Sequence, residues 1–262
     1  MADARLDAEL VRRGLARSRG VASEAIAAGL VTVDGVTVIK PAHRVDETAT
    51  LEITGAERWV SRAAHKLIAA LDLFHVDPTG RIALDAGAST GGFTQVLLDR
   101  GAAEVIAVDV GHGQLAAVIR EDSRVVAIEG VNVRELARAD LGPAIDDRID
   151  LVVADLSFIS LTQVLSSLRD VAEPDADLIL LIKPQFEVGR QGVREGIVRD
   201  RALRQDAVSR VLWTAWDLGL RTVGLASSPI LGGHGNREYL VYFSGTLGTN
   251  PTEWSEAVAA LE

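Results

Sequence analysis

Three ionisable side chains stand at the ends of apolar, strand-like segments. Asp155 follows "LVVA", Lys183 follows "LILLI", and Glu238 precedes "YLVYF". Ligands bind at the carboxyl ends of parallel strands, so we expect these groups at one crevice. Carboxylates and an ammonium gathered there can move a proton or stabilise a developing charge. Each residue also has an ordinary explanation, because most lysines are solvated and charges on edge strands can simply oppose sheet pairing.

A glycine-rich turn lies earlier in the chain, in "LDAGASTGGFTQVLL". A strand is expected to end at Asp85 and a helix to begin near Gly92, so that backbone and helix N–H groups can approach a ligand. About 20 residues on, Asp109 ends a second strand, where its carboxylate can accept two hydrogen bonds from a ribose diol. The glycine-rich turn and Asp109 together predict a nucleoside-containing cofactor. The turn departs from the dinucleotide pattern G-x-G-x-x-G and lacks the lysine of a phosphate-binding loop. A tight turn without a ligand is the alternative.

A β-sheet must position these residues, and the pattern of apolar segments predicts such a sheet. Five apolar segments follow one another, each except the third followed by a helical pattern: "RIALDAG", "AEVIAVDVG", "RVVAIEG", "RIDLVVADLS" and "DADLILLIKP". This alternation is typical of a parallel sheet covered by helices. Two further strands come later, "RTVGLASSP" and "EYLVYFSG". The loop "ILGGHGNR" joins them without a helix, so the last strand is expected to run antiparallel, and a terminal helix should follow Asn250 and Pro251.

The amino-terminal part predicts a small α+β unit. Two helical patterns precede "LVTVDGVTV", which alternates around Asp34-Gly35 and indicates a hairpin. Between Leu10 and Ser23 there is no acid but there are four arginines, Arg12, Arg13, Arg17 and Arg19. The unit is too small for an enzyme core, so we interpret it as a binding module whose arginines meet phosphates. A solvated helix face is the ordinary alternative.

We predict a first domain at residues 1–56, a linker at residues 57–62 and a second domain at residues 63–262. The stretch "RWVSRAAHKL" spans the junction. A helix is expected to start at Ser61, with Arg62 and Lys66 four residues apart on one face.

Composition narrows the class of protein. No apolar run approaches the roughly 18 residues of a membrane span, and the charged opening "MADARLDAEL" is not a signal peptide. The chain has no cysteine and no visible cluster of metal ligands, so neither disulfides nor a metal are expected, and the expected location is cytoplasmic. A net charge of -10 argues against a simple nucleic-acid coat, but basic patches on an acidic protein still attract phosphates.

The quoted motifs, together with "WVSRAAHKL", "DVGHGQL", "KPQFEVG" and "GNREYL", resemble the TlyA family, also called haemolysin A. The resemblance covers nearly the whole chain. It implies an S-four-type RNA-binding domain joined to an FtsJ-like methyltransferase that uses S-adenosylmethionine. The implied fold class is α/β: a Rossmann-like class I methyltransferase with a seven-stranded, mostly parallel sheet whose last strand is antiparallel, and a small amino-terminal α+β RNA-binding domain.

The resemblance also implies roles for individual residues. The family's catalytic lysine, aspartate, lysine and glutamate fall on Lys66, Asp155, Lys183 and Glu238. Lys183 is our choice for the base or hydroxyl-activating group. Cofactor contacts are expected from Asp85, Gly87, Ala88, Ser89, Gly91, Gly92, Phe93, Asp109, Asn132 and Asp155. Asn132 has a nearly equal alternative as a turn residue. RNA contacts are expected from Arg5, Arg12, Arg13, Arg17, Arg19, Arg58 and Arg62.

The function implied is methyl transfer to a ribose 2'-hydroxyl of ribosomal RNA, at a cytidine of 23S rRNA, with 16S rRNA as a further candidate. The expected partners are ribosomal RNA and ribosomal subunits, with no membrane, and the chain is expected to act as a monomer or homodimer. Three alternatives stay open: a methyltransferase for another structured RNA, a non-catalytic RNA-binding factor, and a membrane-lytic protein. The last has no span and no convincing amphipathic cationic helix in its favour.

Overall fold

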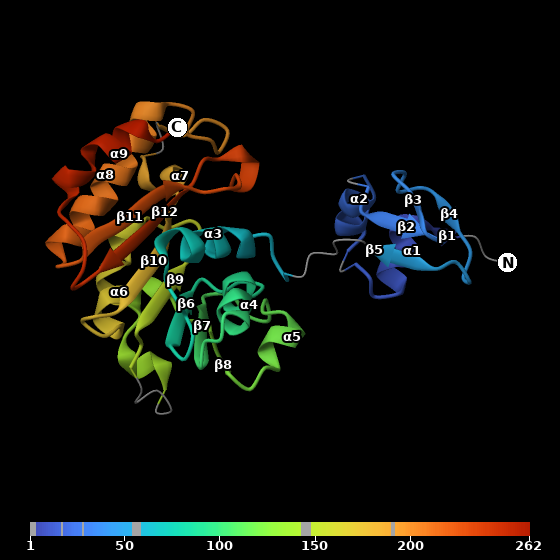
Figure 1. The fold of residues 1–262 in the computed structure, drawn as a ribbon, viewed down its shortest axis with the longest axis horizontal. Helices are drawn as coiled ribbons and strands as arrows, with labels where there is room; N and C mark the ends of the chain where they lie inside the picture. Colours follow the sequence, from blue (N-terminus) through green and yellow to red (C-terminus); the bar gives the residue numbers. More distant parts are fainter. Residues whose placement is uncertain (1–3, 17, 28, 54–58, 143–147, 190–191) are drawn as a thin grey trace. The chain divides into compact units, whose positions relative to one another are not determined.

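The computed structural model describes residues 4–16, 18–27, 29–53, 59–142, 148–189 and 192–262. The chain divides into two compact units, Met1–Arg58 and Trp59–Glu262, both drawn in Figure 1. The linker expected at residues 57–62 lies partly outside the described residues, so the predicted domain bounds stay a prediction.

The smaller unit packs two helices on short strands. Its helices are α1 (Leu6–Arg12) and α2 (Arg19–Ala27), and its strands are β1 (Ala4–Arg5), β2 (Val31–Val33), β3 (Val36–Thr37), β4 (Arg44–Val45) and β5 (Leu51–Ile53). β3, β2 and β5 form one antiparallel sheet, while β1 pairs with β4. Asp34 and Gly35, with φ of 51° and 79°, turn the hairpin between β2 and β3, as expected. Leu6, Leu10 and Ile26 are fully buried in the core.

A seven-stranded sheet forms the larger unit. Its strands are β6 (Ile82–Ala86), β7 (Glu104–Asp109), β8 (Val125–Glu129), β9 (Leu151–Ala154), β10 (Asp177–Ile182), β11 (Arg221–Ser227) and β12 (Tyr239–Ser244). The strand order is β11-β12-β10-β9-β6-β7-β8. Only β12 runs against its neighbours, because it pairs antiparallel with both β10 and β11. The predicted seven-stranded sheet with an antiparallel last strand is confirmed.

Helices cover both faces of this sheet (Figure 1). They are α3 (Ala64–Phe74), α4 (Gly92–Asp99), α5 (Ala117–Arg120), α6 (Leu165–Val171), α7 (Pro184–Glu187), α8 (Arg201–Asp217) and α9 (Ser255–Ala260). Side chains alternate along each strand: Leu84 and Val152 join the core under α6 and α8, whereas Ala83 and Val153 join the core under α3 and α4. Strands buried on both faces explain the continuous apolar runs of the sequence.

Two helix starts test the sequence predictions. The expected start at Ser61 is wrong, because α3 begins at Ala64. The Ser61 hydroxyl accepts a hydrogen bond from the Ala63 N–H at 3.2 Å, and such a local bond favours a turn over a helix. The terminal helix starts as expected: the Asn250 side chain accepts from the Thr252 N–H at 2.8 Å, ahead of a 3-10 turn (Pro251–Trp254) and α9.

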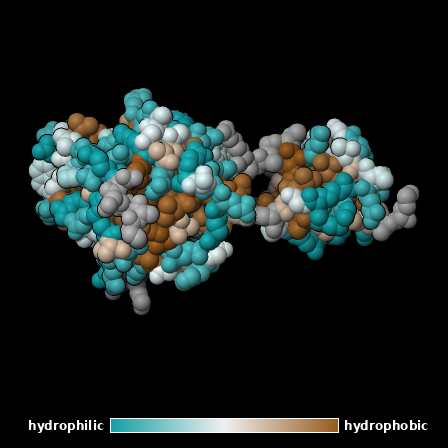
Figure 2. Space-filling view, turned by 90° about the horizontal axis from the view of Figure 1, so that it is seen from below, coloured by the Kyte–Doolittle hydropathy of each residue, from teal (hydrophilic) through white to brown (hydrophobic). Residues whose placement is uncertain are grey.

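The surface carries hydrophobic patches among mainly hydrophilic residues, as the face in Figure 2 shows. Large exposed hydrophobic residues include Val36 and Ile39 in the smaller unit and Phe158 and Trp213 in the larger one. Within the part of the chain that the structure describes, no helix is both long and apolar enough to cross a membrane.

Candidate active site

Two lysines and two carboxylates meet in one buried cluster. The Lys66 Nζ donates to Glu238 Oε2 at 2.6 Å and to Asp155 Oδ2 at 3.1 Å. The Lys183 Nζ lies 2.6 Å from the other oxygen of Asp155, Oδ1. The four residues predicted as catalytic therefore form one chain of ion pairs, in the order Lys183, Asp155, Lys66, Glu238.

Sheet topology brings these four residues together. Asp155 and Lys183 directly follow β9 and β10, which are parallel neighbours, so both side chains emerge at the same edge. Glu238 precedes β12, and because β12 is antiparallel to β10, with Tyr239 opposite Ile182, its start lies beside the end of β10. Lys66 arrives from the first turn of α3, which packs on β10 and β12.

The cluster is largely shielded from water and balances its own charges. The side chains of Lys66 and Glu238 are 7% and 2% exposed, and that of Asp155 is 14% exposed. Burial alone would raise the pKa of Asp155, but the nearby charges of Lys183 and Lys66 outweigh burial and lower that pKa below its usual value. The carboxylate of Asp155 thus stays ionised and can fix both ammonium groups.

Glycine and an amide complete the surroundings of Glu238. A Cβ at Gly232 would lie 2.0 Å from Glu238 Oε1, so this position excludes any larger residue while the carboxylate keeps its place. The Gln185 Nε2 lies 3.4 Å from the same oxygen, at the long end of hydrogen bonding. Neither residue was predicted from the sequence, although their places in "KPQFEVG" and "ILGGHGNR" were a usable signal.

The glycine-rich turn passes close to neighbouring segments. Gly87 has a φ of 83°, and a Cβ there would lie 2.9 Å from Leu156 Cδ2. A Cβ at Gly92, the first residue of α4, would lie 2.8 Å from the Cβ of Ser61. Glycine at these positions therefore lets the turn contact both the loop after β9 and the segment before α3.

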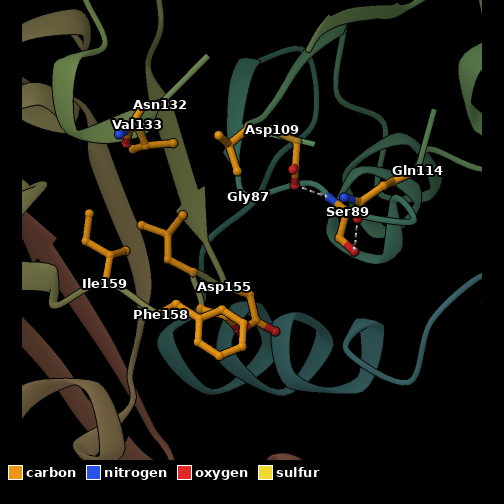
Figure 3. A pocket seen from close by; sticks show the side chains of 12 residues that line it. Gly87, Ser89, Asp109, Gln114, Asn132, Val133, Asp155, Phe158 and Ile159 are labelled. Carbon is orange, nitrogen blue, oxygen red and sulfur yellow. Dashed lines mark hydrogen bonds between the residues drawn. The ribbon is translucent and has the colours of Figure 1, made fainter. Parts of the chain in front are cut away.

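Asp109 organises the turn through its two carboxylate oxygens. Oδ2 accepts from the Ser89 N–H at 2.8 Å, and Oδ1 accepts from the Gly111 N–H at 2.7 Å. Figure 3 shows Asp109 and Ser89 facing each other on one side of the cavity, with Asn132 on another side. The Asn132 side chain accepts from the Arg134 N–H at 3.1 Å, so Asn132 both lines the cavity and serves as the turn residue that was its alternative.

Two adjoining cavities lie along these residues. The larger, of about 520 Å³, is lined by Gly87, Ser89, Asp109, Val110, Gln114, Asn132, Val133, Asp155, Leu156, Ser157, Phe158 and Ile159. The smaller, of about 190 Å³, is lined by Ser61, Ala63, Gly87, Ala88, Ser89, Thr90, Gly92, Phe93, Asp155, Ser157 and Lys183. Gly87, Ser89, Asp155 and Ser157 line both cavities, so the two meet at the ion-paired cluster.

Asp85 and Gly91 were also predicted to contact a cofactor but line neither of these cavities. Asp85 is fully buried behind the turn, where its Oδ2 accepts from the Thr94 hydroxyl at 2.6 Å. Burial raises the pKa of Asp85 to about 7. Asp85 therefore braces the turn against α4 from behind.

The amino-terminal arginines are arranged around two buried carboxylates. Asp7 pairs with Arg5 and Arg19, and Glu9 pairs with Arg12 and Arg13. Hydrogen bonds from Arg12 and then Arg13 lower the pKa of Glu9 to about 2, and those from Arg5 and Arg19 likewise lower the pKa of Asp7.

These arginines differ in how much of the guanidinium group is available to bind a ligand. The Arg13 guanidinium also donates to the carbonyls of Ala49, Asp46 and Glu47, so it braces the fold. The side chains of Arg12 and Arg19 stay 61% and 60% exposed and can reach a ligand. Arg62 is exposed as well, whereas Arg17 and Arg58 lie outside the described residues.

A second set of hydrogen bonds joins the segments that carry Asp155 and Lys183. Glu187, at the end of α7, accepts from the Leu161 N–H at 2.7 Å and from the Ser160 hydroxyl. Burial raises its pKa. Glu187 thus fixes the loop after β9 to the helix after β10, and nothing in the local sequence pattern pointed to this contact.

No group of three His, Asp or Glu side chains suited to a metal ion occurs among the residues that the structure describes. The arrangement instead offers a nucleoside-sized cavity that leads to two ammonium groups held by carboxylates. Such a site can orient a hydroxyl group and stabilise charge on its oxygen, and a lysine of the cluster in its neutral amine form can accept the hydroxyl proton.

Comparisons with known proteins agree with this architecture. The family model for FtsJ-like methyltransferases matches residues 59–244, and that for the S4 domain matches residues 4–51. The 16S/23S rRNA (cytidine-2'-O)-methyltransferase TlyA of Mycobacterium tuberculosis is 54% identical over 242 residues, covering 91% of this chain and 89% of that protein. Hemolysin A of Brachyspira hyodysenteriae is 39% identical over 240 residues, covering 91% of this chain and 99% of that protein.

A solved structure shows the same arrangement of elements. A candidate hemolysin from Streptococcus thermophilus is 37% identical and superimposes with a TM-score of 0.76, covering 99% of this chain and 95% of that chain. The likeness therefore extends over both units of the sequence.

Proposed function

Because the chain belongs to the TlyA (haemolysin A) family, we propose that it transfers a methyl group from S-adenosylmethionine to a ribose 2'-hydroxyl of ribosomal RNA, at a cytidine. The single observation that carries the proposal is the cluster of Lys66, Asp155, Lys183 and Glu238 at the junction of the two cavities. The family predicted from the sequence is confirmed.

The residues present fit the proposed cofactor. Asp109 lies in the larger cavity, where its carboxylate can accept hydrogen bonds from a ribose diol, and Asn132 and Val133 line the place for the base. The smaller cavity adjoins Gly92, where the first N–H groups of α4 favour a carboxylate. S-adenosylmethionine, when bound, supplies a methyl group on a sulfonium, which is a strong electrophile.

The chain's own residues must then prepare the hydroxyl. Lys183 lines the smaller cavity, where its ammonium can hold the 2'-hydroxyl oxygen and its neutral amine form can accept the hydroxyl proton at Nζ. Asp155 fixes Lys183 and Lys66 through separate oxygens, so both cations keep one geometry. Lys66 and Glu238 complete the buried network, and Lys66 also adds positive charge near the oxygen that becomes negative.

For the RNA, the exposed arginines Arg12 and Arg19 of the smaller unit supply phosphate contacts, and ribosomal subunits are the proposed partners. Methylation at 23S rRNA, with 16S rRNA as a second target, rests on the activity named for the M. tuberculosis relative. With ribosomal RNA as substrate, the protein would work in the cytoplasm. The alternative of membrane lysis is not favoured, because the cluster and the cavities serve no role in it.

The test is incubation of purified protein with ribosomal subunits and isotope-labelled S-adenosylmethionine, followed by mapping of the methylated ribose. We expect label at a cytidine 2'-oxygen with the unaltered protein and a loss of at least about 100-fold in rate with Lys183→Met. Full activity of Lys183→Met would contradict the mechanism, and label only on another RNA would contradict the substrate.

A further inference from the structure

Ser157 contacts the amine of Lys183 beside Asp155. The Lys183 Nζ donates to the Ser157 hydroxyl at 3.0 Å, while the same Nζ lies 2.6 Å from Asp155 Oδ1. Ser157 also lines both cavities, and its side chain is exposed. No pattern in the sequence singled out this serine.

The backbone around Ser157 is held in an unusual shape. The next residue, Phe158, has a φ of 67°, a conformation that costs an aromatic residue about 1–3 kcal/mol. Ser160, two residues further on, donates to the buried Glu187 of α7, so the loop is fixed to the helix that follows Lys183. The strained turn at Phe158 and the hydrogen bond from Ser160 to Glu187 together hold the Ser157 hydroxyl facing Lys183.

Two contacts restrict how the Lys183 amine can rotate. The Lys183 Nζ donates a hydrogen bond to the Ser157 hydroxyl, whereas its contact with Asp155 Oδ1 is an ion pair without hydrogen-bond geometry. A neutral amine has two N–H groups and one lone pair, so holding one N–H on Ser157 restricts the directions in which the lone pair can point. Among the described residues Ser157 is the one hydrogen-bond acceptor found for Nζ, and Lys183 lines the smaller cavity, from which a substrate hydroxyl can approach.

We propose that Ser157 is a positioning residue that sets the rotation of the Lys183 amine, so that its lone pair faces the 2'-hydroxyl to be methylated. This inference rests on the proposed function. Three charged groups act with Ser157 on Lys183: Asp155 contacts it directly, Lys66 is linked to it through Asp155, and Glu238 is linked through Lys66. Ser157 need not touch the transferred methyl group.

Kinetics of Ser157→Ala and Ser157→Thr test the proposal. We expect Ser157→Ala to lower kcat about 10-fold and leave KM for cofactor and RNA within about 2-fold, because only the amine's orientation is lost. Ser157→Thr keeps the hydroxyl and should restore most of kcat.

A measurement without turnover tests the placement of the side chain. The protein has no cysteine, so Ser157→Cys introduces a single thiol whose alkylation by iodoacetamide can be timed. We expect saturating S-adenosylmethionine to slow this alkylation at least about 5-fold, because residue 157 lines both cavities. Ser123→Cys is the matched control, since Ser123 is exposed but lines neither cavity, and its thiol should react equally fast with and without cofactor.

Failure of this inference differs from failure of the proposed function. If the unaltered protein is active and Ser157→Ala has the same kcat, the role of Ser157 alone is overturned. Unchanged alkylation of the Ser157→Cys variant in saturating cofactor would overturn its placement. If the unaltered protein bound cofactor but methylated no ribosomal RNA, the proposed function would fail instead.

Discussion

Lys66 and Glu238 are 172 residues apart in the chain, yet their Nζ and Oε2 atoms lie 2.6 Å apart in a buried pair. This contact joins the first turn of α3 to the start of β12 and passes through Asp155 to Lys183. The geometry of the proposed catalytic cluster and the stability of the fold therefore depend on the same network.

Removing Lys66 should damage both properties. In Lys66→Met the buried carboxylates of Glu238 and Asp155 lose a cation, and breaking a buried pair from one side costs about 3–5 kcal/mol. We expect a matching drop in the free energy of unfolding, measured by denaturant titration. Lys40→Met, at an exposed position, should leave stability unchanged. The double variant Lys66→Met, Glu238→Gln should recover part of the stability and none of the activity; equal stability of the single and double variants would contradict the coupling.

The approach of Gly92 to Ser61 should limit what the turn tolerates. In Gly92→Ala the new Cβ would lie 2.8 Å from Ser61 Cβ, so the segment before α3 must shift, at a cost of about 1–3 kcal/mol. Calorimetry should show weaker binding of S-adenosylmethionine. Adding Ser61→Gly removes the clashing atom and should restore much of the affinity. Gly189→Ala, where a Cβ meets no atom within 4 Å, is the control.

Asp109 should govern cofactor affinity through both of its oxygens. Asn in its place has only one accepting oxygen, so either the Ser89 N–H or the Gly111 N–H loses its partner. We expect Asp109→Asn to weaken cofactor binding at least about 10-fold, since a lost bond to a charged group is worth about 1.5–3 kcal/mol. Glu121→Gln, at an exposed position, should bind as the unaltered protein does.

The pH dependence of stability should report the buried Asp85. Its pKa is raised to about 7 by burial, against about 3.9 in the unfolded chain, so the folded state binds the extra proton between these values. Stability should therefore fall as pH rises from about 4 to 7, by about 4 kcal/mol in total. Asp155 acts oppositely, because its pKa is lowered and its contribution is lost only in more acidic solution.

Thermal melts of Asp85→Asn at pH 5 and pH 8 check this assignment. An amide cannot ionise, so the variant's Tm should change less between these pH values than the Tm of the unaltered protein. An equal change in both proteins would show that another group titrates.

Arg12 and Arg13 should separate RNA binding from folding. Arg12→Ala removes an exposed cation and should weaken RNA binding about 3-fold. The slope of log binding constant against log salt concentration should become smaller by about one. Arg13→Ala leaves the carbonyls of Ala49, Asp46 and Glu47 without their donor and should mainly lower stability. Filter binding at several salt concentrations and thermal melts of both variants measure the two effects. The reverse pattern would contradict the division of roles between these two arginines.

The amino-acid sequence by itself determined the local features of this protein. Apolar segments and their spacing predicted the strands, glycines at Gly87 and Gly92 predicted the tight turn, and the missing helix before Glu238 predicted an antiparallel strand. These features depend on periodicity and backbone sterics, which act over a few residues. The four cluster residues came from family resemblance and strand-end positions.

The tertiary structure alone decided which side chains meet. Placing β12 between β10 and β11 brings Glu238 to Lys66, and the strained loop after β9 brings Ser157 to Lys183. Tertiary packing also gives Arg13, a predicted RNA contact, a hydrogen bond to the Ala49 carbonyl 36 residues away. Such contacts follow from long-range strand pairing and burial, whose energies depend on the whole fold and leave no periodic trace in the sequence.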